Sequence, residues 1–286
     1  MKGKLLLIVL FACISLLSCV RGSMPLVNER TVDYTTETKP SQNENSSQHD
    51  SSLRNDAISQ SDTISKNDEP AVTDVSVNGK TDMMSEQQRR CLEKQVKDYD
   101  GNSYHTVYVG NQCWLKENLR ATHGRDGKSL TCYAPNNKPS NVQVYGYLYD
   151  WRSATVVCPK GWHLPTGDDW EMLEDQIVLL GMSCGDGLKK QVAKAMASES
   201  GWQSSSETCA VGNNQHANNA SGFSVLPAGL YNYEHYNNFG YKANFWCAKD
   251  YDAAYAFSCG IGYDNAFVKK FLDTKASGFS VRCVKD

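Results

Sequence analysis

The composition of the chain changes abruptly near residue 90, and this change confines a packed core to the C-terminal two thirds. From Val20 to about Arg90 the sequence is rich in Ser, Thr, Asn, Asp, Glu and Gln, and its only aromatic residue is Tyr34. All six tryptophans lie beyond residue 113, and fourteen of the fifteen tyrosines follow the polar segment. A segment so poor in apolar side chains cannot offset the entropy lost on ordering. We therefore predict a disordered tether over residues 19–90 and one folded domain over residues 91–286.

The N-terminus has the pattern of an export signal. Lys2 and Lys4 precede an almost unbroken apolar run, Leu5–Leu17, which is shorter than the roughly 20 residues that a membrane span needs. The run ends in Leu-Leu-Ser-Cys at 16–19, which resembles the lipobox of bacterial lipoproteins. The resemblance implies that residues 1–18 are removed and that Cys19 is diacylated. The alternative is an ordinary signal cleaved at another small residue, such as Gly22.

This interpretation places the protein in the cell envelope, bound to a membrane through its lipid. Residues 20–23 lack the Asp that retains some lipoproteins at the inner membrane, and they lack the acidic cluster that favours surface display. We therefore expect the outer membrane and leave the side of the membrane open. The net charge of −3, with no basic run, argues against nucleic acid as a partner.

Beyond the anchor, nine cysteines fit an oxidising compartment, where disulfides are the usual state. None forms a C-x-x-C pair, so a zinc ribbon is a poor interpretation. Because nine is odd, at least one thiol is free or pairs outside the chain. Spacing alone does not give the connectivity. The nine are Cys91, Cys113, Cys132, Cys158, Cys184, Cys209, Cys247, Cys259 and Cys283.

Apolar periodicity predicts an α+β domain. A meander of short antiparallel strands is expected over 96–119, where His105 is a surface residue. A helix capped by Thr166 is expected to run to Gly181 and to pack Trp170, Leu173, Ile177 and Leu180 against the core. A second helix is expected over 187–197. Composition also permits a short leading helix over 82–96, capped by Ser85. Further strands are expected over 222–227, 243–248, 253–259 and 278–284.

Six segments carry a family resemblance. They are DGNSYHTVYVGNQCWLKENL at 100–119, YGYLYDW at 145–151, CPKGWHLPTGDDWEML at 158–173, SGFSVLPAG at 221–229, FWCA at 245–248 and GFSVRCVKD at 278–286. In this order they resemble the Fibrobacter succinogenes major paralogous domain, found in exported and lipid-anchored proteins of Fibrobacter and Bacteroidetes. The resemblance spans nearly the whole of residues 91–286.

This family is similar to the C-type-lectin-like fold, including the sulfatase-modifying group. The resemblance implies a domain of short antiparallel strands with two main helices, whose chain ends meet in one sheet. It also implies a disulfide between Cys158 and Cys283, because the lectin-like fold commonly ties its helix region to the last strand. A second disulfide, Cys247 with Cys259, is expected across a hairpin around 249–252.

The resemblance brings no activity with it, and the residues give no catalytic constellation. The calcium-ligating tripeptides of lectins are absent, and so are G-x-S-x-G and H-E-x-x-H. Formylglycine-generating chemistry needs late, closely spaced copper-binding cysteines, and for Cys247 and Cys259 a structural disulfide is the favoured interpretation. His163, in the GWHLPT turn, is expected to be buried and structural. We predict no enzyme, no metal and no cofactor.

A segment rich in Tyr, Asn and Gly, 212–241, is the best candidate for binding. Tyr231, Tyr233, Tyr236 and Tyr241 suit stacking on sugar rings, while neighbouring amides offer hydrogen bonds. The alternative is that these aromatics complete the core and the asparagines hold turns. Three functions stay open: a module that binds a glycan or an envelope protein, a structural or adhesive envelope protein, and an enzyme of unrecognised mechanism.

Overall fold

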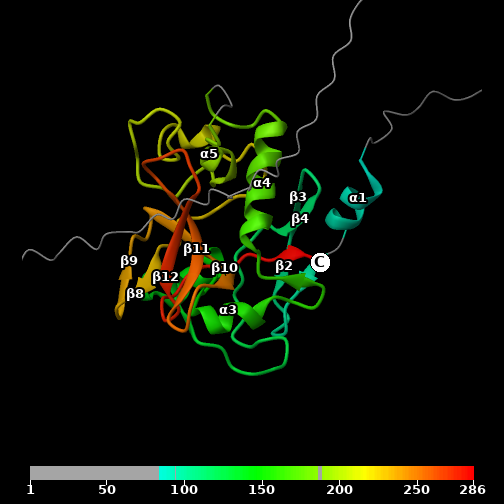
Figure 1. Ribbon diagram of the computed structural model, residues 1–286, viewed down its shortest axis with the longest axis vertical. Coiled ribbons are helices and arrows are strands. Elements are labelled where there is room, and N and C mark those ends of the chain that lie inside the picture. Colours follow the sequence, from blue (N-terminus) through cyan, green and yellow to red (C-terminus); the bar gives the residue numbers. More distant parts are fainter. Residues whose placement is uncertain (1–83, 94, 186–188) are drawn as a thin grey trace, which may run out of the picture. The chain divides into compact units, whose positions relative to one another are not determined.

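The computed structural model describes residues 84–93, 95–185 and 189–286 (Figure 1). The predicted signal, Cys19 and nearly all of the predicted tether lie outside these residues. The described chain is α+β, with few helices and several small antiparallel sheets of short strands, as predicted.

The described chain begins with a short helix, α1 (Glu86–Leu92), and this supports the leading helix that composition permitted. Ser85 caps it by accepting a hydrogen bond from the Gln88 backbone N–H at 3.1 Å. The helix contacts β3 (Thr106–Val109), and a disulfide joins Cys91 to Cys113. Residues 86–90, which composition assigned to the tether, are therefore helical.

The predicted meander is present and is extended by the end of the chain. Its strands are β1 (Val96–Lys97), β2 (Ser103–Tyr104), β3 and β4 (Gln112–Leu115). Sheet order is β3-β4-β13-β7, where β7 is Trp162–His163 and β13 is Val284–Lys285. The last strand thus pairs with β4 near the domain's beginning, as the resemblance implied.

The main helix, α4 (Gly167–Leu179), follows the predicted signals. Thr166 and Asp169 form a reciprocal capping box, which satisfies backbone donors at the helix start. Trp170, Leu173 and Ile177 are buried at helical spacing. One detail was wrong: Leu180, expected on the core face, lies at the C-terminal cap and is 50% exposed.

The predicted second helix over 187–197 is wrong in length, because only one turn forms, α5 (Ala193–Met196). The chain before α5 has its backbone bonded to other segments: Gln191 O accepts from the Cys184 N–H, and the Ala193 N–H donates to Ala266 O. A disulfide between Cys184 and Cys209 also restrains this region. Residues 186–188 lie outside the described chain.

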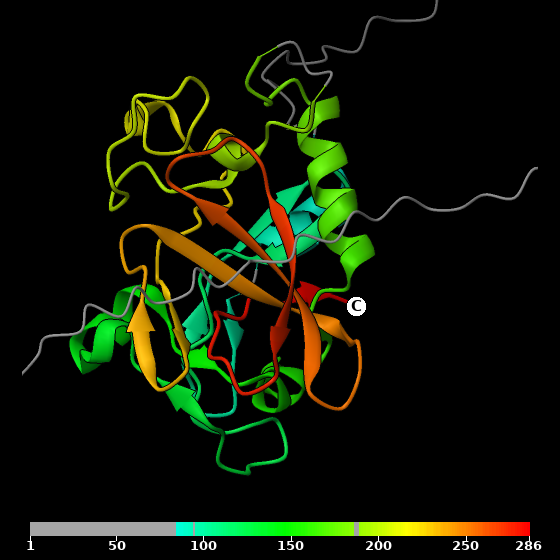
Figure 2. The ribbon, with the colours of Figure 1, turned by 60° about the vertical axis from the view of Figure 1, so that its left-hand side comes forward.

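A second sheet is formed by β10 (Lys242–Asp250), β11 (Tyr255–Gly262) and β12 (Lys269–Thr274), in that order (Figure 2). The predictions for 243–248 and 253–259 are confirmed. Residues 222–227 form no strand and make only a single bridge, between Val225 and Ala197. Residues 278–284 run mainly through isolated bridges before β13.

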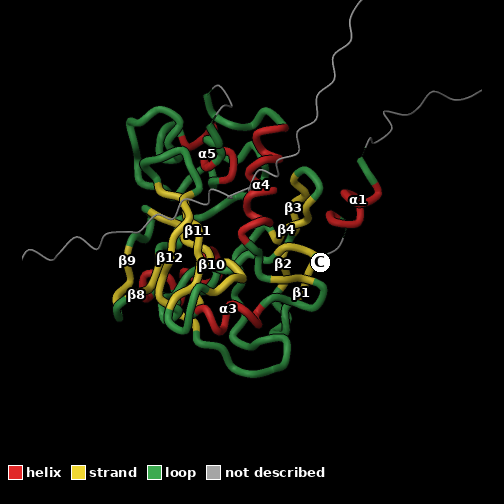
Figure 3. Tube along the Cα trace, in the orientation of Figure 1, coloured by secondary structure: helices red, strands yellow, loops and turns green. Residues whose placement is uncertain are grey.

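The remaining elements are short, and loops connect most of them (Figure 3). They are β5 (Cys132–Tyr133), β6 (Leu148–Tyr149), β8 (Leu230–Asn232), β9 (His235–Asn237), α2 (Val142–Tyr145), α3 (Trp151–Val157), and the 3-10 turns η1 (Pro135–Asn137), η2 (Pro139–Asn141) and η3 (Gln215–Ala217). β5 pairs with β6 and β8 pairs with β9, each as a separate two-stranded ladder.

Two groups of buried side chains form the core. One lies between α4 and the β10–β11 strands and contains Trp114, Trp170 and Phe223. The other packs around α3 and contains Tyr149, Trp246 and the cysteines of two disulfides. Aromatic side chains thus fill both halves of the core, as the clustering of tryptophan in the sequence indicated.

Candidate functional site

The turn of the β8–β9 hairpin exposes a tyrosine whose backbone is in a strained conformation. Tyr231 pairs with Tyr236 in the ladder, so the two-residue turn is Tyr233-Glu234. Both turn residues have positive φ, 47° for Tyr233 and 64° for Glu234. Such turns favour Asn-Gly, because side chains with a Cβ are strained there. Tyr233 is nevertheless 69% exposed, so burial of its ring does not explain the strain.

Behind the tip, three tyrosine rings lie against one another. The Tyr231 ring stacks on Tyr133 with ring centroids 3.8 Å apart and planes at 20°. The Tyr236 ring lies 5.1 Å from Tyr231 at a tilt of 59°. All three rings are half-buried. We call Tyr133, Tyr231, Tyr233 and Tyr236 the tyrosine surface.

Gly278 fixes where this surface sits. Its N–H and C=O both bond with the Tyr231 backbone, at 2.6 and 2.9 Å. A Cβ at Gly278 would lie 2.8 Å from the Tyr133 ring, so any larger residue would push the stack apart. The hairpin also contacts η1, where Asn136 and Asn137 both have φ of 54°. Asn136 and Asn137 therefore lie in a turn beside the hairpin.

Partial burial shifts the acidity of two of these rings. It raises the pKa of Tyr133, and neighbouring Tyr231 and Asp150 act in the same direction. It also raises the pKa of Tyr236, with a further contribution from Tyr231. Both phenols stay neutral at any physiological pH, so the tyrosine surface offers uncharged aromatic faces and hydroxyl groups.

The structure separates the fourth predicted tyrosine, Tyr241, from the other three. Its ring packs edge-on against Tyr263, 5.3 Å away, and it is 43% exposed. Tyr133 takes its place in the cluster, and sequence reasoning missed it. The signal available was weak: Tyr133 precedes a Pro-Asn-Asn turn, but nothing local connects it to residues a hundred positions later.

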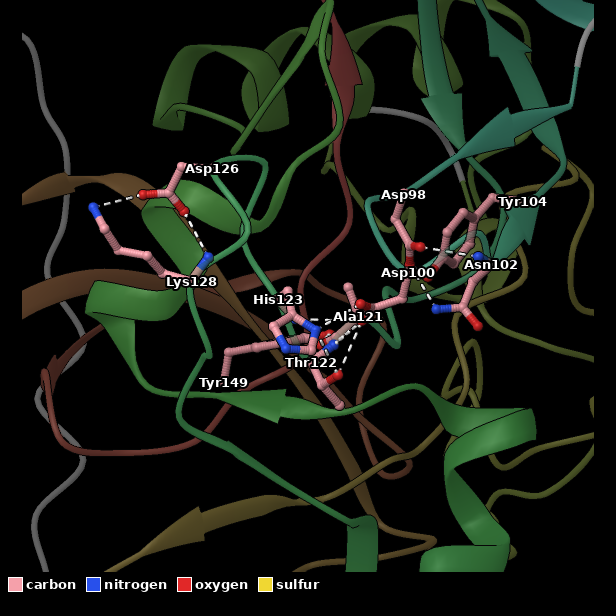
Figure 4. Close-up of polar contacts among 10 residues, drawn as sticks. All are labelled: Asp98, Asp100, Asn102, Tyr104, Ala121, Thr122, His123, Asp126, Lys128 and Tyr149. Carbon is pink, nitrogen blue, oxygen red and sulfur yellow. Dashed lines mark hydrogen bonds and ion pairs between the residues drawn. The ribbon is translucent and has the colours of Figure 1, made fainter.

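A polar network lies in the loops after β1, and its side chains form hydrogen bonds with one another (Figure 4). Asp98 accepts hydrogen bonds from Asn102 and from the Tyr104 hydroxyl, the latter at 2.6 Å. Asp100 accepts from the Thr122 backbone at 2.6 Å and bonds to His123 Nδ1 at 2.6 Å. The DGN segment of the family resemblance is therefore structural, since it ties the 98–102 loop to residues 120–123.

The pKa of Asp100 reflects this network. Partial burial acts to raise it, but the hydrogen bonds from Thr122 and His123 outweigh burial and lower the pKa. Burial and the bond to Asp98 raise the pKa of Tyr104. Both groups thus keep the protonation state that their hydrogen bonds need.

The three histidines that a hydrolytic site could use, His163, His216 and His235, lie on different elements of the fold. His163 bonds to Asp286 at 2.7 Å and to Asp169 at 3.3 Å, which links β7, the end of the chain and the start of α4. It is half-exposed, not buried as expected. His216 lies in η3 and His235 in β9, both exposed. His105 is exposed as predicted and bonds to Glu117.

One of the two predicted disulfides forms and the other does not. Cys158 and Cys283 are bonded across a sequence separation of 125, as the resemblance implied. Cys247 and Cys259 are not bonded, so that prediction is wrong. Cys259 lies opposite Phe245 in the ladder, which makes Cys247 its diagonal neighbour. Diagonal Cα atoms are about 7–8 Å apart in regular pairs, beyond ordinary disulfide reach.

Cys132 is the third free cysteine of the described chain. Burial, together with the charges of Asp100 and Asp150, raises the pKa of its thiol to about 11. A thiol with this pKa is almost wholly protonated at neutral pH and is a poor nucleophile. Cysteine-based catalysis at this position is therefore disfavoured.

A comparison with protein families supports the sequence resemblance. The model of the Fibrobacter succinogenes major domain matches residues 107–285, more than half of the chain. The chain belongs to this family. Comparisons with curated proteins and with solved structures gave no match.

The Fibrobacter succinogenes major domain includes all of the tyrosine surface. The match begins inside β3, so α1, β1 and β2 precede the matched range. The disulfide between Cys91 and Cys113 connects this leading segment to the family domain. Within the described ranges, no helix is long and apolar enough to cross a membrane, and no three His, Cys, Asp or Glu side chains gather as metal ligands.

Proposed function

We propose that this protein is a lipid-anchored cell-envelope lipoprotein whose Fibrobacter succinogenes major domain binds glycans through the tyrosine surface. The observation that carries the proposal is the tip of the β8–β9 hairpin, where an exposed aromatic residue occupies a strained backbone position. Strain of this kind costs about 1–3 kcal/mol per residue and clusters at functional sites. An exposed tyrosine maintained at that cost is better explained by binding than by folding.

The chemistry of the surface suits sugars. Aromatic faces stack on the apolar faces of pyranose rings, and phenol and amide groups bond to hydroxyls. Asn232 and Asn237 lie on the same hairpin, their side chains 2.8 Å apart, and Asn136 borders it. Because Tyr231 is held by Gly278 and by the Tyr133 ring, little rotamer freedom is lost on binding.

A glycan screen with the full chain tests the binding proposal. We expect binding to at least one envelope or host polysaccharide, and a roughly tenfold loss, about 1.4 kcal/mol, in each of Tyr231→Ala, Tyr233→Ala and Tyr236→Ala. The matched control is Tyr251→Ala, because Tyr251 is 63% exposed but lies outside the tyrosine surface. Equal losses in Tyr233→Ala and Tyr251→Ala, or no binding to any glycan, would reject the proposal.

A second experiment tests the anchor, which lies outside the described residues. We expect the wild-type chain to incorporate a fatty-acid label and to sediment with outer membranes. Cys19→Ala should lose both properties. Protease treatment of intact cells then shows on which side of the membrane the domain lies. If Cys19→Ala keeps the label, the lipid is elsewhere and the anchor proposal fails.

If no glycan binds, a structural or adhesive role becomes the leading alternative. The same tyrosine surface then serves as a contact for an envelope protein, and the four variants are compared by retention of envelope proteins on the immobilised chain. The proposed absence of catalysis is tested separately, by incubation of the chain with every glycan that it binds. Any product would reopen the enzyme alternative.

A further inference from the structure

Three strands of four or more residues lie at the edges of the two larger sheets of the described chain: β3, β10 and β12. β3 is packed against α1, where the Thr106 hydroxyl donates to Cys91 O at 2.6 Å. β10 is irregular after Trp246, and Gly229 and Ser280 form bridges to it. β12 is the third, and it forms the other edge of the same sheet as β10 (Figure 2).

β12 is regular along its whole length. Its six residues, Lys269–Thr274, pair with β11 without a register shift, and the strand contains no proline or glycine. No other strand of the described chain pairs with its outer side. Native edge strands are ordinarily protected by a bulge, a proline, a covering segment or charged side chains. Of these, β12 has only charges, so its pairing with another strand depends on what those charges face.

A second copy of the chain is the partner that these charges fit. When two identical antiparallel strands are related by a two-fold axis, one residue faces its own copy, and residues at equal distances on either side face each other. Centred on Phe271, this pairing places Lys269 opposite Asp273 of the second copy, and the contact occurs twice. Opposite charges that face each other directly stabilise a strand pair.

The other two-fold registers bring like charges together. Centred on Lys270 or on Asp273, a charged residue faces its own copy. Centred on Leu272, Lys269 faces Lys275. Like charges directly opposite each other destabilise a strand pair. Among the registers that pair at least half of the strand, the charge pattern therefore favours only the one centred on Phe271.

The side chains that would form this contact lie on one face of the sheet. Because side chains alternate along a strand, Lys269, Phe271 and Asp273 point to the same side. Lys269 is exposed, and Asp273 is half-buried and accepts a hydrogen bond from Ser258 Oγ at 2.5 Å. A carboxylate can accept several donors, so the bond to Ser258 orients Asp273 without excluding a lysine.

Lys270 lies on the other face, and its charge is compensated within its own chain. Its Nζ atom is 3.8 Å from Glu171 Oε2 of α4, and its side chain is 27% exposed. In the register centred on Phe271 it faces Leu272 of the second copy, which can pack along the apolar stem of the lysine. Lys270 therefore adds no like-charge contact between the copies.

We propose that β12 is a homodimer interface, at which two copies join their three-stranded sheets edge to edge with Phe271 at the two-fold axis. Backbone hydrogen bonds across the edge provide the attraction, and the two contacts between Lys269 and Asp273 set the register. One strand from each copy buries less than a standard interface, so the dimer is weak and reversible. The surface is separate from the tyrosine surface, and a dimer presents two tyrosine surfaces to one polymeric partner.

Sedimentation equilibrium of the full chain, in detergent that is density-matched to the solvent, tests the dimer. We expect the average mass to rise from one chain towards two as concentration increases. Lys269→Asp and Asp273→Lys should each weaken association about tenfold, because each creates two like-charge contacts. An equimolar mixture of the two variants should restore association, since the acidic variant then faces the basic one.

The matched control is Lys160→Asp, the same change at an exposed lysine outside β12, and it should leave association unchanged. Because Asp273 also bonds to Ser258, circular dichroism first establishes that its variant folds. If that variant does not fold, the comparison of Lys269→Asp with Lys160→Asp still tests the interface. A chain that stays monomeric up to its solubility limit, or equal effects of Lys269→Asp and Lys160→Asp, would overturn the proposal.

Cysteine cross-linking tests the register. In a Cys132→Ser background, the Lys269→Cys chain is mixed with the Asp273→Cys chain under mild oxidation. Residues directly opposite have Cβ atoms about 5 Å apart, so the mixture should give a covalent dimer. Within either variant alone, the two new cysteines are four residues out of register, about 13 Å apart, and should not link. Equal cross-linking in all three samples, or none in a mixture of folded chains, contradicts the register.

Discussion

Arg282 and the tyrosine surface both lie close to the final segment of the chain, yet they are built on opposite principles. Arg282 is 1% exposed, and its guanidinium donates to Phe223 O and to Asn118 Oδ1 and lies over the Phe223 ring. Tyr233, by contrast, is 69% exposed and has a strained backbone. The first region uses a polar side chain to fasten the core. The second exposes an aromatic side chain at a cost to folding.

The comparison distinguishes residues that the domain needs for stability from residues that it needs for function. Removal of a buried cation leaves its hydrogen-bond acceptors without a donor and therefore lowers stability, even though Arg282 Nε itself has no partner within the described chain. A strained, exposed residue is removed with a gain in stability, unless something binds it. Substitutions in the two regions should therefore change stability in opposite directions, and only those in the second should change binding.

The largest effect is expected from the disulfide next to Arg282. Cys158→Ala with Cys283→Ala opens a covalent loop of 125 residues, which by chain entropy lowers the free energy of unfolding by about 4–5 kcal/mol. Removal of Cys184 and Cys209, 25 residues apart, should cost about 3–4 kcal/mol. Urea unfolding measures both. Equal costs would show that residual structure or solvation, and not loop length, sets the contribution.

Arg282→Met should lower the free energy of unfolding by about 3 kcal/mol. It leaves Asn118 Oδ1 and Phe223 O without this donor in a buried site. Burial lowers the pKa of Arg282 to about 9, and the charge of Glu117 acts in the opposite direction, so the guanidinium is still charged at neutral pH. Glycan binding per folded molecule should not change. A cost below about 1 kcal/mol would show that the guanidinium barely offsets its own desolvation.

Glu174 should make stability depend on pH. Its pKa rises from 4.5 unfolded to about 7 folded, so the folded state favours the protonated carboxyl. The associated stability is complete below pH 4.5 and is lost as pH rises through 7, a change of about 3 kcal/mol. The difference in unfolding free energy between wild type and Glu174→Gln, measured from pH 4.5 to 8, isolates this contribution. A constant difference would contradict it.

The parts of the fold that local signals specify were predictable from sequence. Thr166 and Asp169 delimit the start of α4 and Gly181 delimits its end, and each acts on backbone groups within a few residues of itself. The glycine-containing turns likewise marked the meander. The second helix failed because its periodicity was outweighed by the Cys184–Cys209 disulfide and by backbone bonds to distant segments. Such contacts leave no local pattern.

The candidate site was only partly predictable for the same reason. Three of the four chosen tyrosines lie on one hairpin, where local sequence brings them together. Tyr133 joins them through contacts with Gly278 and Tyr231, which are formed only in the folded domain. The error at Cys247 and Cys259 arose from the bulge in β10, since an unbroken hairpin count does not reveal which residues oppose each other.

The smallest effect, at the hairpin tip, is the sharpest test of the contrast. Tyr233→Asn places at φ of 47° a residue that tolerates this region, so the free energy of unfolding should rise by about 0.5–1 kcal/mol. The same change removes the exposed ring, so glycan binding should weaken about tenfold. Tyr251→Asn is the matched control: Tyr251 is similarly exposed but is not among the residues with positive φ, and its ring lies edge-on to Phe257, so no gain in stability and no loss of binding are expected.

Two results for Tyr233→Asn would contradict these expectations in different ways. A loss of stability in Tyr233→Asn would mean that the ring packs in solution, which would remove the argument that its strain serves binding. A gain in stability with unchanged binding would locate the ligand on the Tyr133, Tyr231 and Tyr236 rings alone. Because strain and binding are measured on the same variant, a stability gain that accompanies a binding loss is the one outcome that a purely structural hairpin cannot give.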